Sequence, residues 1–200
     1  MHKRFTLGSL REWHWISSAL CLAGLLLFAV TGITLNHAGQ IEGRNAITTV
    51  ETQLPEELLV MAREASIGEA GLPQRLQDFL EQQINTSLYG RAPEWNPGEL
   101  YIGMPRPGAD AWLSLDLETG DLLFEDTDRG LIAYFNDLHK GRHTGIAWSW
   151  FIDVFAAVCV LFSLTGLLLL RRQVASRPTT WPLTGLGLLI PLLLMFLLIH

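Results

Sequence analysis

The stretch Asp137–Arg172, DLHKGRHTGIAWSWFIDVFAAVCVLFSLTGLLLLRR, decides the fold of this chain. Residues 147–170 within it form an apolar run in which Asp153 is the one charged residue, and two arginines follow. At about 1.5 Å per residue, a helix over this run is roughly 36 Å long, which is enough to cross the hydrocarbon core of a membrane. The sequence therefore predicts a membrane-spanning helix with His139 and His143 just ahead of its start.

The rest of the composition also indicates a membrane protein. The chain is 49% hydrophobic and only 17% charged, with a mean hydropathy of +0.26 over 200 residues. Two further apolar runs, at residues 14–36 and 181–199, are each long enough for one span. We expect three transmembrane helices, with residues 37–146 forming a separate domain between the first two.

Basic residues predict which ends of the spans face the cytoplasm. Lysine and arginine concentrate in residues 1–13 and in the short link 171–180. By the positive-inside rule both segments are cytoplasmic, so residues 37–146 lie on the opposite side. The first span has an apolar core that is too long for a cleaved signal peptide, so we interpret it as an uncleaved anchor.

The domain between the spans is strongly acidic. Residues 41–138 hold 18 acidic side chains against six arginines and no lysine, a balance of −12. Such a surface argues against nucleic acid and anionic lipid as partners of this domain. Simple solvation or a cationic partner fits it better.

Local patterns predict a small α+β domain. Pro55 and Pro73 each open a helix, and residues 130–138 resume helical spacing. The strands are Leu100–Ile102 and a hairpin over residues 111–125 that turns at Thr119-Gly120. The expected apolar stripes are Leu58, Met61 and Ala65 on the first helix and Leu76, Phe79, Leu80 and Gln83 on the second.

Three histidines are expected at the outer ends of the first two spans. If these spans pack antiparallel, His37 and His143 reach one depth on facing helices, as two neutral imidazoles do around a six-coordinate haem iron. His139 is an equally suitable ligand, and it shares a face with His143 if both are helical. Two other interpretations compete: these histidines bind zinc, or they simply lie in the headgroup region of the membrane. The motif CxxCH is absent, so covalently attached haem is excluded.

The inner membrane face offers fewer candidates. His14 lies 23 residues before His37, roughly 34 Å along a helix, so these two cannot share a cofactor. A second haem there would need His2, a ligand that is not histidine, or His14 of a second copy. Asp153 is interpreted either as a group that orients a histidine or pairs with Arg142 beside a haem propionate, or as a helix-contact residue.

A short pattern occurs in both of the first two spans. Leu27–Gly32 reads LFAVTG and Leu161–Gly166 reads LFSLTG. Because the two spans cross in opposite directions, a shared pattern would be an inverted repeat. We favour the simpler interpretation, in which threonine and glycine let membrane helices approach closely.

The chain resembles the PepSY-associated transmembrane proteins of Gram-negative bacteria. The resemblance is carried by REWHWISSALCLAGLLLFAVTGITLNH at 11–37, DLETG at 116–120 and LHKGRHTGIAWSWFIDVFAAVCVLFSLTG at 138–166. It implies a periplasmic PepSY-like domain, a helix packed on an antiparallel sheet, between helices of the inner membrane. Larger members resemble haem-bearing reductases of ferric siderophores, which implies possible axial ligands at His14, His37, His139 and His143.

The function that follows from this resemblance is electron transfer. We expect an inner-membrane protein with one non-covalent haem b, with room for a second, that serves periplasmic ferric siderophore reduction in iron acquisition. Its expected partners are membrane lipid, an iron-siderophore or siderophore-uptake proteins and an electron donor of unknown identity, with a homo-oligomer as a further possibility. The alternatives are a non-enzymatic membrane-anchored module that binds a periplasmic partner, and a metal-binding sensor or chaperone.

Overall fold

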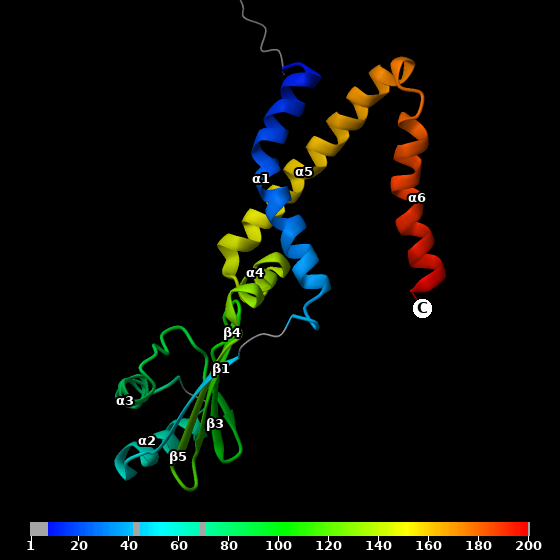
Figure 1. Cartoon of the computed structure of the whole chain (residues 1–200). Helices are drawn as coiled ribbons and strands as arrows, with labels where there is room; N and C mark the ends of the chain where they lie inside the picture. The colour runs from blue at the N-terminus through cyan, green and yellow to red at the C-terminus, as the bar shows by residue number, and fades with distance from the viewer. Residues whose placement is uncertain (1–7, 42–44, 69–70, 200) are drawn as a thin grey trace, which may run out of the picture. The chain divides into compact units, whose positions relative to one another are not determined.

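The computed structural model of the chain describes residues 8–41, 45–68 and 71–199. The chain divides into two compact units. The helical unit comprises Met1–Leu27 with Trp150–His200, and the central unit comprises Phe28–Ser149. Figure 1 allows the elements to be followed from the blue N-terminal helix α1 to the red C-terminal helix α6.

Three helices are long and apolar enough to cross a membrane within the described residues. They are α1 (Leu10–Asn36), α5 (Gly145–Gln173) and α6 (Thr180–Leu198), and a short 3₁₀ turn, Val174–Ser176, extends α5. Each overlaps one apolar run of the sequence, because a backbone in lipid must satisfy its own hydrogen bonds and a helix does so within one segment. The expectation of a three-helix membrane protein is confirmed.

In the helical unit, α1 and α5 pack against each other in opposite directions. His14 of α1 meets Thr165 of α5, and ten residues later Gly24 meets Phe155, which lies ten residues before Thr165. A Cβ atom at Gly24 would overlap the Phe155 ring, so the glycine allows the close crossing. The helix α6 has no buried residue.

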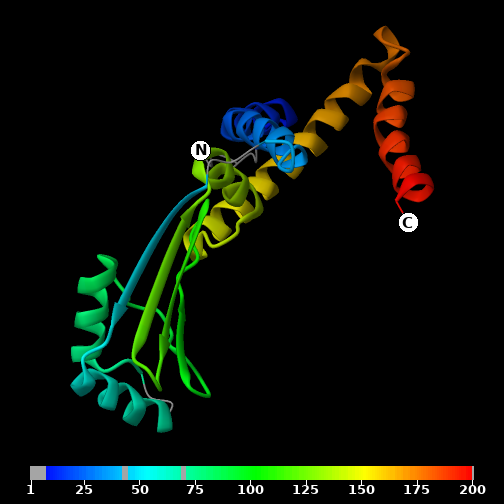
Figure 2. The same cartoon turned by 60° about the horizontal axis from the view of Figure 1, so that its bottom comes forward.

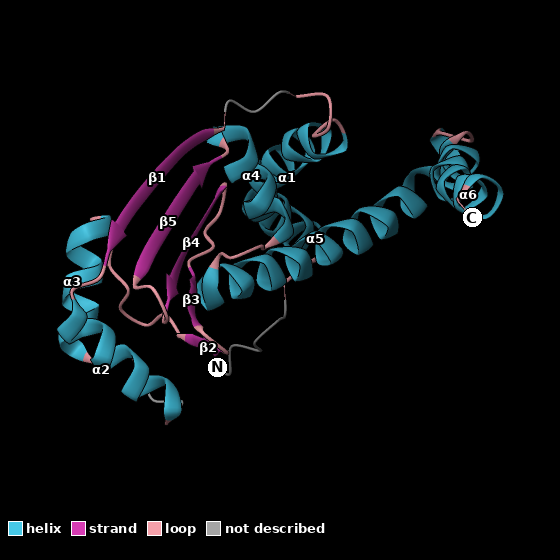
Figure 3. Ribbon diagram, turned by 90° about the horizontal axis from the view of Figure 1, so that it is seen from below, coloured by secondary structure: helices cyan, strands magenta, loops and turns pink. Residues whose placement is uncertain are grey.

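The central unit contains an antiparallel sheet in the order β1-β5-β4-β3-β2 (Figure 3). The hairpin of β4 and β5 forms its centre, with Leu113 opposite Phe124. On the outer side of β5, Val50 of β1 also pairs with Phe124. The strands are β1 (Ala46–Gln53), β2 (Glu94–Asn96), β3 (Glu99–Gly103), β4 (Ala109–Asp116) and β5 (Asp121–Asp128).

One face of this sheet is covered by two helices, α2 (Glu56–Ile67) and α3 (Gln74–Ile84), as Figure 2 shows. Alternate residues of β4 are buried, because successive side chains in a strand point to opposite faces. The core is almost entirely aliphatic, and its largest fully buried side chains are Leu76, Leu80, Leu100, Ile102, Leu113, Leu115 and Leu122.

Most of the predicted elements of this domain are present. The hairpin, the strand at Leu100–Ile102 and the three helices are confirmed. The strands β1 and β2 were not predicted. The stripe expected on α2 was partly wrong, because Leu58, Leu59 and Ala62 are its buried residues while Met61 and Ala65 are half-buried. On α3, Leu76, Leu80 and Ile84 are buried and Gln83 is not.

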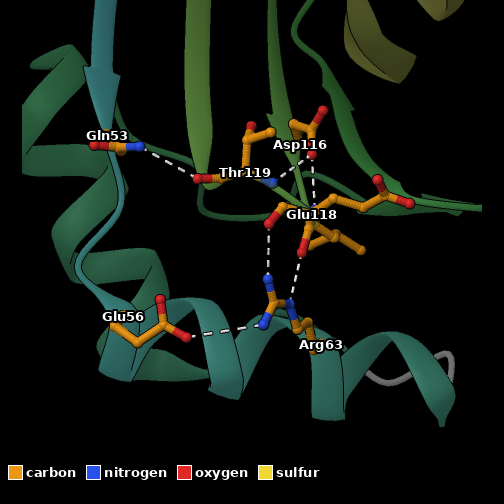
Figure 4. A network of polar contacts seen from close by, with 7 residues as sticks. Gln53, Glu56, Arg63, Asp116, Glu118 and Thr119 are labelled. Atoms are coloured by element: carbon orange, nitrogen blue, oxygen red, sulfur yellow. Dashed lines mark hydrogen bonds and ion pairs between the residues drawn. The ribbon is translucent and has the colours of Figure 1, made fainter.

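The β4–β5 turn is fixed by polar contacts that also bind it to α2 (Figure 4). The Asp116 carboxylate accepts hydrogen bonds from the backbone N–H groups of Glu118, at 2.7 Å, and Thr119, at 2.8 Å. These donors, Thr119 first, lower the pKa of Asp116. From α2, Arg63 donates to the carbonyls of Leu117 at 2.6 Å and Glu118 at 2.9 Å.

Candidate functional site

One histidine of the central unit is held against α1. His139, near the end of α4 (Gly130–Lys140), places its Nδ1 atom 2.7 Å from the Thr31 hydroxyl oxygen. Its ring lies beside the Phe28 ring, with 5.0 Å between centroids, and over Gly32, where an added Cβ would come within 3.7 Å of the His139 Cε1 atom. We call these four residues, His139, Phe28, Thr31 and Gly32, the His139 niche.

The hydroxyl group of Thr31 favours the tautomer of His139 in which Nδ1 carries the proton. Thr31 donates its own hydrogen to the Phe28 carbonyl, 3.2 Å away, so its oxygen acts as the acceptor toward the ring. The Nδ1 atom of His139 is then the protonated nitrogen, and Nε2 keeps its lone pair. With Nδ1 bonded to Thr31, Nε2 is the ring nitrogen that remains for another partner.

The helix α4 is attached to the sheet by one buried carboxylate. Asp137 accepts hydrogen bonds from the Gly108 backbone N–H at 2.9 Å and from the Arg129 guanidinium at 2.9 Å. Gly108 has a φ of +70°, and a Cβ there would lie 2.6 Å from the backbone of Tyr134. A glycine is therefore required where the start of β4 meets α4.

Two further contacts fix α4 within the central unit. The Thr34 hydroxyl donates to the Asn136 side-chain oxygen at 2.7 Å, one turn beyond Thr31 on α1. The Trp148 indole N–H donates to the Leu138 carbonyl at 2.9 Å. Because α4 is held from both sides, the position of the His139 ring is set by the fold and not by its side chain alone.

The helical unit holds a second histidine in the same way. The His14 Nδ1 atom lies 3.0 Å from the Thr165 hydroxyl oxygen, and the ring stacks on Phe162 at 4.9 Å and 12°. A Cβ at Gly166 would come within 3.3 Å of the His14 ring. Thr165 donates to the Leu161 carbonyl at 2.8 Å, which here too favours the tautomer with the proton on Nδ1 and the lone pair on Nε2. These residues, His14, Phe162, Thr165 and Gly166, form the His14 niche.

The two niches are built from the two copies of the short sequence pattern. Phe28, Thr31 and Gly32 occupy the same positions in LFAVTG as Phe162, Thr165 and Gly166 occupy in LFSLTG. The favoured interpretation, small residues for packing, was incomplete, because each threonine also binds a histidine. Sequence reasoning named the histidines but missed their Phe and Thr partners, and the repeat was the signal that could have identified them.

A pocket of about 510 Å³ lies beside the His14 niche. The residues that line it combine the imidazole with two guanidinium groups, from Arg11 and Arg172, and with apolar surface. Two cations beside an imidazole suit a ligand that carries carboxylates on an apolar body. The other lining residues are Trp15, Ser18, Leu169 and Gln173.

The remaining predicted histidines are exposed. The His37 Nδ1 atom donates to the Ile33 carbonyl, 3.0 Å away, which leaves Nε2 facing outward from this contact. The Nε2 atom of His143 instead accepts a hydrogen bond from the Arg142 Nε–H at 3.1 Å. The expected helical face shared by His139 and His143 is wrong, because α4 ends at Lys140 and His143 has a φ of +57°.

The other sequence-predicted residues lie apart from the niches. Asp153 is exposed on α5 and has no hydrogen-bond partner among the described residues of the helical unit. His2, one expected partner of His14, lies outside the described residues. Within the described part of the chain no three His, Cys, Asp or Glu side chains converge as a metal site requires. His14, His37 and His139 are each positioned singly, by a hydrogen bond to Nδ1.

Comparison with known proteins gave one match. The model of the PepSY_TM-like family matches residues 5–200. A search of the curated proteins found no match, and a search of the solved structures found none either. The match covers nearly the whole chain, including both niches, the sheet and the three long helices. The chain therefore belongs to the PepSY_TM-like family.

Proposed function

We propose that this chain is a haem b electron-transfer protein of the bacterial inner membrane that contributes to ferric siderophore reduction on the periplasmic side. The proposal is supported by one observation: each of the two niches places a histidine against a phenylalanine, a threonine and a glycine. In each niche a threonine oxygen lies within hydrogen-bond distance of Nδ1, which leaves Nε2 as the ring nitrogen available to a metal.

The residues of each niche fit one axial ligand of a haem iron. Histidines that ligate metals donate the other ring N–H to a neighbouring acceptor, which fixes the tautomer and the ring plane. Glycine at position 32 or 166 lets the ring lie flat against the helix, and the phenylalanine excludes water from one side. A bound haem b would supply one-electron oxidation and reduction there.

Other residues of the chain would complete the sites. His37, whose Nδ1 is bonded to a backbone carbonyl, is a second candidate ligand for the His139 end. His139 is preferred to His143 because the Nε2 atom of His143 already accepts a hydrogen bond from Arg142. Beside His14, the guanidinium groups of Arg11 and Arg172 would bind propionates.

The direction of electron flow follows from the charges at the ends of the spans. Basic residues at the start of α1 and in the link between α5 and α6 favour a cytoplasmic N-terminus. The central unit then faces the periplasm, where an iron-siderophore or a siderophore-uptake protein would accept electrons. An electron donor would approach the His14 end.

The test is a dithionite-reduced minus oxidised visible spectrum of the full chain, purified after expression with ample haem. A pyridine haemochrome assay counts haem per chain. We expect a b-type α-band, with haem content reduced by His139→Ala and by His14→Ala and retained in the control His143→Ala. A protein without any haem band, or one whose band survives both niche substitutions, overturns the proposal.

The same experiment separates the proposal from the alternative function. A membrane-anchored module that only binds a periplasmic partner would be colourless, and it would keep its cellular role in the His14→Ala and His139→Ala variants. It would lose that role when residues 45–128, which contain the sheet and its covering helices, are removed.

A further inference from the structure

The helix α4 exposes an apolar face. Leu131 is 70% exposed, Ile132 is 45% exposed and Phe135 is 36% exposed. Most large apolar residues of the sheet and of its covering helices α2 and α3 are, in contrast, buried. Tyr134, at 41% exposure, sits beside them with its ring edge-on to Phe135. A surface helix in water normally turns such residues inward, so this face needs another apolar partner.

The apolar face lies on the same side of α4 as His139, and His139 shows which neighbour that side meets. Leu131, Phe135 and His139 follow one another at intervals of four residues, so they lie along one side of the helix with a drift of only about 40° per step. At the end of α4 this side contacts α1, where His139 reaches Thr31 and Gly32. Toward the start of α4, the same side continues with Leu131, which the described residues leave 70% exposed.

The part of α1 that receives His139 belongs to a membrane span. Thr31 and Gly32 lie within the helix Leu10–Asn36, which is long and apolar enough to cross a membrane. A helix whose side faces the flank of a membrane span near its end must lie close to the surface of the bilayer. The uncovered residues of that side then point toward lipid and not toward bulk water.

Cations gather on one side of α4, facing the end of α1. A pocket of about 520 Å³ between the end of α1 and α4 is lined by three of them, Arg129, Lys140 and Arg142. Asp137 is the one acid among its lining residues, and it already binds Arg129. The Arg129 Nε–H is buried and has no hydrogen-bond partner among the described residues. This local excess of positive charge contrasts with the acidic sheet domain.

We infer that α4 is an interfacial helix that rests on the membrane surface. Leu131, Ile132 and Phe135 lie among the acyl chains at the boundary, and Arg129, Lys140 and Arg142 bind phosphate groups of the phospholipids. The combination of an apolar side and flanking cations is that of helices that lie in the membrane plane. This assignment does not depend on any haem, because it uses only the position of α4 on α1.

The depth of α4 can be measured by electron paramagnetic resonance. Cys21→Ala and Cys159→Ala provide a background without native thiols. A spin label is then placed by Ile132→Cys or, as a control isoleucine on α2 that is 87% exposed where Ile132 is 45% exposed, by Ile67→Cys. In phospholipid nanodiscs, we expect high oxygen and low nickel-chelate accessibility at position 132 and the reverse at position 67. An aqueous profile at position 132 overturns the inference.

The role of the cations is tested in a separate experiment. Native mass spectrometry measures how much phospholipid stays bound to the detergent-purified chain. Lys140→Gln with Arg142→Gln should weaken phospholipid binding by about fivefold per cation. The matched control, Arg75→Gln with Arg91→Gln, removes two exposed cations of the sheet domain and should change nothing. Equal retention in both pairs would contradict the role of the cations, and equal loss would show that the binding is not located at α4.

Discussion

Thr31 and Thr165 are the residues on which the histidine sites depend most directly. Each donates its hydrogen to a carbonyl of its own helix and accepts the Nδ1 hydrogen of a histidine, at 2.7 Å for His139 and 3.0 Å for His14. Valine has nearly the same shape as threonine but cannot accept a hydrogen bond. Replacing either threonine by valine frees the ring to rotate and to change its tautomer.

We therefore predict that Thr31→Val or Thr165→Val lowers haem affinity by about 10- to 100-fold, the usual effect of removing the partner of a ligating histidine. The measurements are haem retention and the position of the α-band, and Thr→Ser at the same position should restore both. Thr184→Val is the matched control, since Thr184 also donates to a carbonyl four residues before it but binds no histidine. A wild-type spectrum in both valine variants would contradict the prediction.

A second residue-scale prediction concerns the turn of the central hairpin. Backbone N–H groups of Thr119 and Glu118 lower the pKa of Asp116, so the folded state favours its ionised form. The resulting stability is present above the ordinary aspartate pKa of about 4 and is lost as the pH falls through the lower pKa of the folded state. Asp116→Asn should flatten this part of the pH dependence, measured as the midpoint of thermal unfolding between about pH 6 and pH 3. Glu64→Gln, an exposed acid on α2, should leave the profile unchanged.

At the residue scale, the sequence named His14 and His139 among its candidate histidines but not the residues that hold them. His139 and His143 looked equivalent because their spacing suits one helix face. They are separated because α4 ends at Lys140 and Gly141 adopts a φ of +67°, which a glycine after a helix allows. Thr31 and Thr165 could not be assigned to particular histidines, because pairing across 108 or 151 residues of sequence is a property of the fold.

At the scale of elements, the crossing of α1 and α5 depends on Gly24. A Cβ atom there would overlap the Phe155 ring, and both helices are fixed further along by the His14 niche. Gly24→Val should destabilise the crossing by about 1–3 kcal/mol, the usual effect of overpacking, and should also weaken the His14 site. Thermal unfolding in detergent measures the first effect and haem retention the second. Gly185→Val on α6 is the control, because nothing lies within 4 Å of its added Cβ.

Elements with a strong local signal were predicted, and those without one were missed. The hairpin was found because leucines alternate with polar residues along β4 and a Thr119-Gly120 turn follows. The strand β1 is an edge strand whose residues are mostly exposed, so it shows no such alternation. Its run Ile47-Thr48-Thr49-Val50 is rich in β-branched residues, and this was the available signal. The strand β2 is only three residues long.

At the scale of the whole molecule, composition alone was sufficient to predict three apolar helices. Their lengths and hydropathy follow from the thickness of a bilayer, which does not depend on the details of packing. Which side of the membrane each segment faces is predicted from the positions of the charged residues and not from the fold. Arginine and lysine occupy both the N-terminal segment and the link between α5 and α6, whereas the domain between α1 and α5 is acidic.

The positive-inside rule predicts that the central unit and the α5–α6 link lie on opposite sides of the membrane. Single cysteines at Tyr89, which is 88% exposed, and at Ser176, which is exposed in the link, report on the two sides in a Cys21→Ala and Cys159→Ala background. In intact spheroplasts an impermeant maleimide should label Tyr89→Cys and not Ser176→Cys, and inverted vesicles should give the reverse. Labelling of both in spheroplasts would contradict the predicted sidedness. It would also remove the basis for electron transfer toward the periplasm, while the two histidine niches would remain as they are.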